Sequence, residues 1–271
     1  MQRILLFVFI VCIPNCIQAQ SSSQPETKKE KKKHSFYASW GYNAETYTQS
    51  NIYVKQSSLN NDYTLVNINA RDHQGWNDGV TNKAVSIPQY NYRLGYIFDE
   101  EKGYGIELNF DHTKYLIDEP QKVHIKGTLG GRNVDSSFTF VSSNGFYYYL
   151  NNGANFFLIN FVKRWHLIAD KSQNIKIDAL GKAGIGPLVP HVQNSLFGQA
   201  NAQLFQLGGW NTGVEGTIKA TFYKYAYIEF CAKLDYARYS GLHVYEGTAH
   251  QAFGTFEMIM NLGVNIPGRK K

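Results

Sequence analysis

Apolar and polar residues alternate along most of the chain from His34 onward, and this alternation predicts β-strands. Between Gln89 and Phe98 every second residue is apolar or aromatic, while the residues between them are polar or small. A period of two is that of a strand with one apolar and one polar face. The pattern recurs and predicts eight strands, centred on 36–42, 89–98, 104–111, 157–165, 175–185, 214–222, 228–236 and 256–264.

The connections between these segments alternate in length. Three are tight turns and four are long: the turns are 99–103, 169–173 and 223–225, and the long connections are 46–86, 117–153, 187–207 and 241–248. Strands of about ten residues with short turns at one end and long loops at the other are typical of a transmembrane barrel. We therefore predict an all-β fold, an eight-stranded antiparallel up-and-down transmembrane β-barrel. An even strand count puts both termini on the side of the short turns, which is the periplasm in such proteins.

The polar face of the predicted strands carries six basic and seven acidic residues: Arg93, Arg164, Lys176, Lys182, Lys219, Lys233, Glu107, Asp111, Asp178, Glu215, Glu229, Asp235 and Glu257. The interior of an eight-stranded barrel is just wide enough to be filled by side chains, and charges buried there must pair. We expect Glu107, Glu215 and Glu229 inside, each near an Arg or Lys, and no conducting pore. The competing fold is a soluble barrel with an apolar cavity, which would exchange the two faces.

The N-terminus has the pattern of an export signal. Arg3 precedes an apolar run at 4–13, which is too short to cross a bilayer as a helix but has the length of a signal peptide. We expect a signal peptide at 1–19, a basic periplasmic tail at 20–33, the outer-membrane barrel at 34–266 and a basic C-terminal tail at 267–271. Processing as a lipoprotein at Cys16 is the alternative. Cleavage before Gln20 would leave Cys231 as the only cysteine, so no internal disulfide is expected.

Composition narrows the range of partners. The formal net charge is +6, and apart from the tail the Lys and Arg residues are spread along the strands. A nucleic-acid-binding protein gathers its basic residues into a patch or stripe, so we expect no nucleic-acid partner. Aromatic residues make up 15% of the chain, and those near strand ends are placed like the aromatic girdles at membrane interfaces. We expect a monomer in the outer membrane, in contact with lipid and lipopolysaccharide.

Two histidines stand near the predicted outer rim. His112 ends the third strand on its lipid-facing side, and His191 follows the fifth strand. These strand ends could lie about 10 Å apart, and two imidazoles there could bind a divalent metal ion or act as acid and base. We predict one polar pocket with His112, His191 and Asp111 as catalytic residues and Lys114 as the ligand of a lipid phosphate. The alternative is that each histidine is an interfacial residue bonded to a loop carbonyl.

Several segments resemble a family of small bacterial outer-membrane barrels that includes the lipid A oxidases. The similar segments are 87–93 (IPQYNYR), 105–114 (GIELNFDHTK), 151–160 (NNGANFFLIN) and 183–192 (AGIGPLVPHV). The resemblance implies an oxygen-dependent, metal-assisted oxidation of the lipid A sugar. Two positions depart from the family pattern: Gln193 stands where a Glu is usual, and no histidine precedes Gly153.

Two classes of function follow. The first is a protein that binds or modifies lipid A or lipopolysaccharide at its outer rim, with an oxidase-like activity if it is an enzyme. The second is a non-catalytic surface barrel whose long loops have an adhesion or structural role. The relative positions of His112 and His191 distinguish the two, because a shared site requires both on the same side of the barrel.

Overall fold

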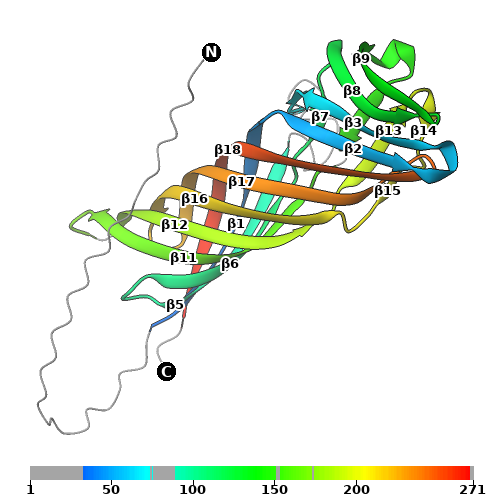
Figure 1. Ribbon diagram of the computed structural model, residues 1–271. Coiled ribbons are helices and arrows are strands. Elements are labelled where there is room, and N and C mark those ends of the chain that lie inside the picture. The colour runs from blue at the N-terminus through cyan, green and yellow to red at the C-terminus, as the bar shows by residue number, and fades with distance from the viewer. Residues whose placement is uncertain (1–32, 74, 76–88, 151–152, 173, 269–271) are drawn as a thin grey trace, which may run out of the picture. The chain divides into compact units, whose positions relative to one another are not determined.

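The computed structural model describes residues 33–73, 75, 89–150, 153–172 and 174–268, and most of these form antiparallel β-strands (Figure 1). The predicted signal peptide, nearly all of the basic tail and residues 269–271 lie outside the described residues. The expectation of an all-β antiparallel fold is confirmed.

One group of long strands pairs into a closed ring, which we call the barrel. Its members are β1 (Ser35–Tyr47), β5 (Tyr90–Asp99), β6 (Tyr104–Asp111), β11 (Phe156–Ala169), β12 (Ile175–Leu188), β16 (Gly209–Phe222), β17 (Ala226–Val244) and β18 (Gly247–Pro267). Each pairs with its neighbours in chain order, and β18 pairs with β1 from Ser35–Pro267 to Tyr47–Thr255, which closes the ring. Short connections after β5, β11 and β16 join strands at one end, which we call the turn end.

The two faces of the barrel wall differ in polarity as the alternation predicts. On β17, Phe230 and Leu234 are more than half exposed on the outer face, whereas Glu229, Lys233 and Asp235 between them are buried. The same division holds on β6, where Ile106 and Leu108 point outward and Glu107 is 1% exposed. The barrel is therefore apolar outside and polar inside, the opposite of a soluble barrel.

The long connections also form strands, and the prediction that they are loops is wrong. The first group extends the barrel sheet from the start of β18 in the order β2 (Ser50–Gln56), β3 (Asn61–Ile68), β8 (Gln121–Leu129) and β9 (Arg132–Phe140). The second forms a separate sheet of β4 (Ala70–Arg71), β7 (Tyr115–Ile117), β10 (Tyr147–Leu150), β13 (His191–Leu196) and β14 (Gln199–Ala200), with β15 (Leu204–Phe205) paired to β13. Two 3-10 helices, η1 (Ser57–Leu59) and η3 (Ser142–Asn144), complete this region. We call these strands and helices the cap.

The cap has a hydrophobic core of its own. Ile52, Leu65 and Tyr63 from the first group of strands are completely buried, as are Tyr148 and Leu150 from the second sheet. The far ends of β17 and β18 contribute to the same core: Tyr239, Leu242, Val244, Ala249 and Phe253. These long strands, drawn in orange to red in Figure 1, therefore belong to both the barrel and the cap.

Candidate functional site

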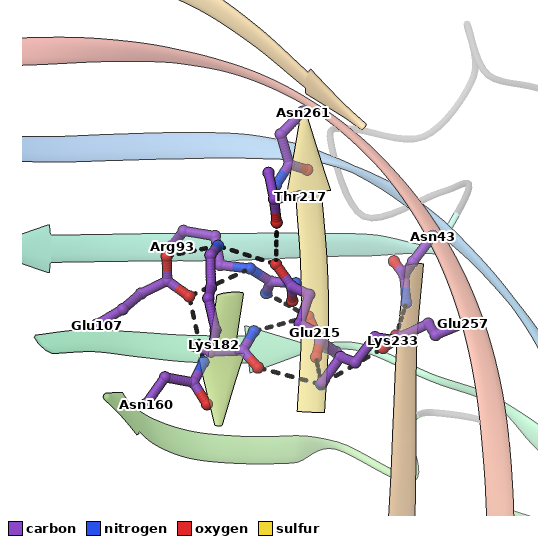
Figure 2. Close-up of polar contacts among 12 residues, drawn as sticks. Asn43, Arg93, Glu107, Asn160, Lys182, Glu215, Thr217, Lys233, Glu257 and Asn261 are labelled. Carbon is purple, nitrogen blue, oxygen red and sulfur yellow. Dashed lines mark hydrogen bonds and ion pairs between the residues drawn. The ribbon is translucent and has the colours of Figure 1, made fainter. Parts of the chain in front are cut away.

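A network of buried ion pairs fills the middle of the barrel (Figure 2). Arg93, from β5, lies at its centre. Its guanidinium Nη1 is 2.5 Å from Asp111 Oδ1, its Nη2 is 3.3 Å from Glu215 Oε2, and its Nε is 3.8 Å from Glu107 Oε1. The four side chains come from three strands, because Asp111 and Glu107 both lie on β6 and Glu215 lies on β16. All four are almost completely removed from solvent, so each depends on the others for its charge balance.

Two lysines extend this network in opposite directions. Lys182 Nζ lies 2.8 Å from Glu107 Oε2 and 2.9 Å from Glu215 Oε1. Lys233 Nζ lies 2.5 Å from Asp111 Oδ2, 2.8 Å from Asp235 Oδ2 and 3.4 Å from Glu257 Oε2. The prediction that Glu107 and Glu215 lie inside the barrel beside Arg or Lys is confirmed.

Glu229 is also inside the barrel, and its hydrogen-bond donors are neutral side chains. Its Oε1 accepts hydrogen bonds from Ser39 Oγ at 3.1 Å and Asn261 Nδ2 at 3.0 Å, and no ion pair within 4.0 Å involves it among the described residues. Lys219 has a different environment: its Nζ lies 3.5 Å from the centre of the Tyr227 ring and 2.8 Å from Asn265 Oδ1. Lys219 is nevertheless the cross-strand neighbour of Glu229 in the pairing of β16 with β17, so Glu229 has a lysine nearby as predicted.

Apolar side chains lie on both sides of the ion-pair network along the barrel. Toward the turn end, Tyr37, Ile97, Val162, Leu180 and Tyr227 form a small buried cluster. At the other end the core of the cap covers the barrel. The interior is thus layered, with a buried charged layer between two apolar ones.

The predicted rim histidines lie just beyond the ends of two strands, His112 after β6 and His191 at the start of β13, three residues after β12 ends. His112 lies one residue beyond β6, stacks on the Tyr90 ring with 4.8 Å between ring centres, and its Nδ1 donates to Asn155 Oδ1 at 2.9 Å. Asn155 Nδ2 in turn donates to the Val189 carbonyl at 2.9 Å, two residues before His191. Asn155 therefore joins the ends of β6 and β12 across the start of β11. Burial lowers the pKa of His112 below its usual value, and the nearby Lys114 acts in the same direction.

His191 is buried beside Phe205, with 4.7 Å between the ring centres, and its Nδ1 has no hydrogen-bond partner among the described residues. Its backbone NH donates to the Gly153 carbonyl at 2.8 Å. Both histidines therefore flank the segment 153–155.

The other two predicted site residues are placed differently. Asp111 points into the barrel, where it binds Arg93 and Lys233, so its carboxylate belongs to the interior network. Lys114 is 6% exposed, and its carbonyl accepts a hydrogen bond from Tyr47 Oη at 2.8 Å. The fold thus brings His112 near the segment that carries His191, while Asp111 is committed to the interior.

Among the described residues, no group of three or more His, Cys, Asp or Glu side chains is arranged to hold a metal ion. In the same part of the chain, no helix is long and apolar enough to cross a membrane.

Sequence reasoning missed two kinds of functional residue. Asn155, which connects the two histidine-bearing segments, has no signal in the sequence because its role depends on three strand ends meeting. Glu45 and Gln89 also face the interior, with Gln89 Nε2 donating to Glu45 Oε2 at 2.6 Å. Their position in the inward phase of β1 and at the start of β5 could have identified them.

No protein-family model matches the chain, and no curated protein sequence matches it. Several solved structures are similar to it, and two of them are outer membrane proteins. The crystal structure of the outer membrane protein OprG from Pseudomonas aeruginosa is 9% identical and covers 88% of this chain and 98% of its own, with a TM-score of 0.40. The solid-state NMR structure of the outer membrane protein AlkL in DMPC lipid bilayers is 7% identical and covers 93% of this chain and 98% of its own, with a TM-score of 0.31. The assignment of function therefore rests on the geometry of this chain.

Proposed function

We propose that this protein is an eight-stranded outer-membrane barrel, with both termini in the periplasm, that anchors the cap on the cell surface in a non-catalytic, structural or adhesive role. The observation that carries the proposal is the reversed polarity of the barrel. Leucine, isoleucine and aromatic side chains cover its outside, while its charges are inside. Such a wall is stable only where hydrocarbon replaces water on the outside.

The interior argues for an anchor rather than a channel. Water or solute would have to pass the ion pairs around Arg93, then the apolar cluster at the turn end and the core of the cap. Breaking a buried ion pair leaves an uncompensated charge, which costs about 3–5 kcal/mol. A barrel filled in this way is a rigid support, so the part that can meet a partner is the cap.

The cap suits a surface role because it is folded. Its hydrophobic core fixes the positions of its strands, and β9, the outer strand of the hairpin that it forms with β8, presents mostly exposed polar side chains. Binding surfaces are commonly built from connecting segments held on a rigid scaffold.

Four measurements test this proposal. The mature protein should fractionate with outer membranes, show heat-modifiable gel mobility, and expose a tag placed between Gly130 and Gly131 to antibody on intact cells. Planar bilayers containing it should show no steady conductance. Release as a soluble periplasmic protein, or an open pore, would contradict the proposal.

A second candidate is the binding or oxidase-like modification of lipid A at the rim. The observation that favours it is the hydrogen-bonded connection from His112 through Asn155 to the segment before His191, with the buried His191 Nδ1 left unpaired. Such an imidazole is available to a ligand or a metal ion.

Mass spectrometry of lipid A from cells with and without the protein tests this candidate. If the protein modifies lipid A, lipid A from cells that contain it should differ in mass from lipid A of cells that lack it. His112→Ala and His191→Ala should each abolish this difference while the barrel still assembles. Identical lipid A profiles would leave the structural role alone.

A further inference from the structure

The outer face of the barrel has a hollow near the cap. It measures about 260 Å³ and lies where β1 and β17 flank β18. Gly254 forms its floor because it has no side chain, and the exposed Leu234 and Phe256 stand beside it. Thr46 and Thr48, both exposed, complete its rim on the β1 side.

The hollow lies at the upper limit of the apolar band, where "upper" means toward the cap. On β17 the outward positions run through Phe230, Leu234 and Tyr236, and the next outward residue is the exposed Arg238. Tyr236 is paired with Gly254 on β18, so Arg238 lies only two residues farther along the wall, at a rise of about 3.3 Å per residue. The hydrocarbon surface therefore ends in a positive charge directly above the hollow.

Arg238 is available to a ligand. No hydrogen bond or ion pair involves its side chain in the part of the chain that the structure describes. Its cross-strand neighbour on β16 is Trp210, which lies 5.8 Å from Tyr236 between ring centres. Trp and Tyr side chains are enriched at the level of lipid headgroups, so this pair indicates that Arg238 lies at that level.

We propose that the hollow over Gly254 and the guanidinium of Arg238 form a binding site for one phosphorylated glycolipid of the outer leaflet, lipid A. An acyl chain fills the hollow between Leu234 and Phe256, and a sugar phosphate binds Arg238. The site rests on the proposed membrane orientation, which places the cap end in the outer leaflet. It lies on β17, β18 and β1, separate from His112, which follows β6, and from His191, which begins β13.

The geometry favours this lipid over an ordinary neighbour. The guanidinium of Arg238 can form two parallel hydrogen bonds to a phosphate. These bonds would hold one lipid in place, whereas an ordinary lipid around the barrel exchanges freely. The hollow is continuous with the lipid-facing wall, so an acyl chain enters it without crossing a polar boundary. The hydroxyl groups of Thr46 and Thr48 at its rim can form hydrogen bonds with a sugar headgroup, which an acyl chain cannot.

The test is native mass spectrometry of the folded mature protein in detergent, titrated with diphosphoryl lipid A. We expect one bound lipid A, with apparent affinity lowered about fivefold by Arg238→Ala. Gly254→Leu, which fills the hollow, should lower it about tenfold. Dephosphorylated lipid A should bind the wild-type protein about as weakly as intact lipid A binds Arg238→Ala.

Two matched variants control for general effects of charge and size. Arg132→Ala removes an exposed arginine from the cap, and Gly216→Leu adds a leucine to the outer face of β16, where an added Cβ meets nothing within 4 Å. Both should bind lipid A like the wild-type protein. Equal losses in the controls, or equal binding of phosphatidylglycerol, would overturn the proposed site. Heat-modifiable mobility is measured on every sample, and its absence in the wild-type protein would overturn the barrel itself instead.

Discussion

The barrel and the cap are built from the same alternating strands, but the polarity of the buried face is inverted between them. In the barrel part of β17 the buried residues are Glu229, Lys233 and Asp235, and the exposed ones are apolar. In the cap part of the same strand the buried residue is Tyr239 and the exposed one is Arg238. The inversion occurs within a few residues, without a break in the strand. It teaches that the period of a strand predicts its two faces, while the surroundings of each face decide whether polar or apolar residues line it.

The two regions are also stabilised differently. The cap gains free energy by removing apolar side chains from water, as a soluble domain does. In the proposed membrane location the outer face of the barrel is in contact with hydrocarbon, so it makes no such gain. Its interior must instead satisfy every buried charge and hydrogen-bonding group, so specific pairs matter more there.

The largest effect should come from the ion-pair network. Glu107→Ala leaves Arg93 and Lys182 to share the Glu215 carboxylate and removes the acceptor of Tyr37 Oη, so we expect a loss of about 3–5 kcal/mol in the free energy of unfolding. Urea unfolding in lipid vesicles measures it. The exposed turn residue Glu101 is the control, and Glu101→Ala should change little. A loss below about 1 kcal/mol for Glu107→Ala would show that the network does not hold the barrel.

A somewhat smaller and local effect should follow from a change in the cap core. Leu65→Ala removes a fully buried side chain and should cost about 2–5 kcal/mol, confined to the cap. Hydrogen exchange should speed up in β2, β3 and β8, while heat-modifiable mobility persists. Leu207→Ala, at a residue that is 73% exposed, is the matched control. Loss of barrel mobility together with cap protection would mean that the regions fold as one unit.

A third prediction concerns space inside the barrel. A Cβ added at Gly95 would lie 1.9 Å from the Tyr37 ring, so Gly95→Ala should destabilise by about 1–3 kcal/mol. Gly216→Ala on the outer face is the control, because nothing lies within 4 Å there. Equal unfolding midpoints for the two variants would mean that the barrel interior is not packed as described.

The smallest effect should be the pH dependence of the free energy of unfolding that comes from His112 at the rim. Because burial lowers the pKa of His112 in the folded state, the unfolded chain binds its proton more readily. Stability contributed by neutral His112 is present above its ordinary pKa of 6.5 and is lost as pH falls from there through the folded-state pKa. His112→Gln should flatten the unfolding curve in that range. If the stability of this variant depended more strongly on pH than that of the wild-type protein, the direction assigned to the pKa shift of His112 would be wrong.

Much of the barrel could be predicted from the sequence because the alternation of polar and apolar residues within each strand already defines its two faces. The alternation around Glu107 and Leu108, or around Glu229 and Phe230, specifies both faces without knowledge of any partner strand. The interior charges follow from the same phase. Glu229 shows the limit, because its partners Ser39 and Asn261 come from strands distant in sequence.

The cap could not be predicted in the same way. The cap strands alternate between apolar and polar residues over too short a stretch to indicate which sheet each strand joins. Examples are the pair Ile52 and Val54 and the pair Val123 and Ile125. Their burial depends on β2 pairing with the start of β18 and β8 pairing with β3, contacts that no local pattern specifies. The rim has the same difficulty, since Asn155 acquires its role only where β6, β11 and β12 end together.

The central claim is that the outer face of the barrel meets lipid up to Tyr236 and water from Arg238. Spin labels placed singly at positions 228–240 of β17, in a Cys231→Ala background and in lipid vesicles, test it directly. Accessibility to oxygen dissolved in the bilayer should peak at the even positions from 228 to 236, with a period of two. At 238 and 240 the labels should instead become accessible to a water-soluble nickel complex. Oxygen maxima at the odd positions, or nickel accessibility throughout, would contradict the account.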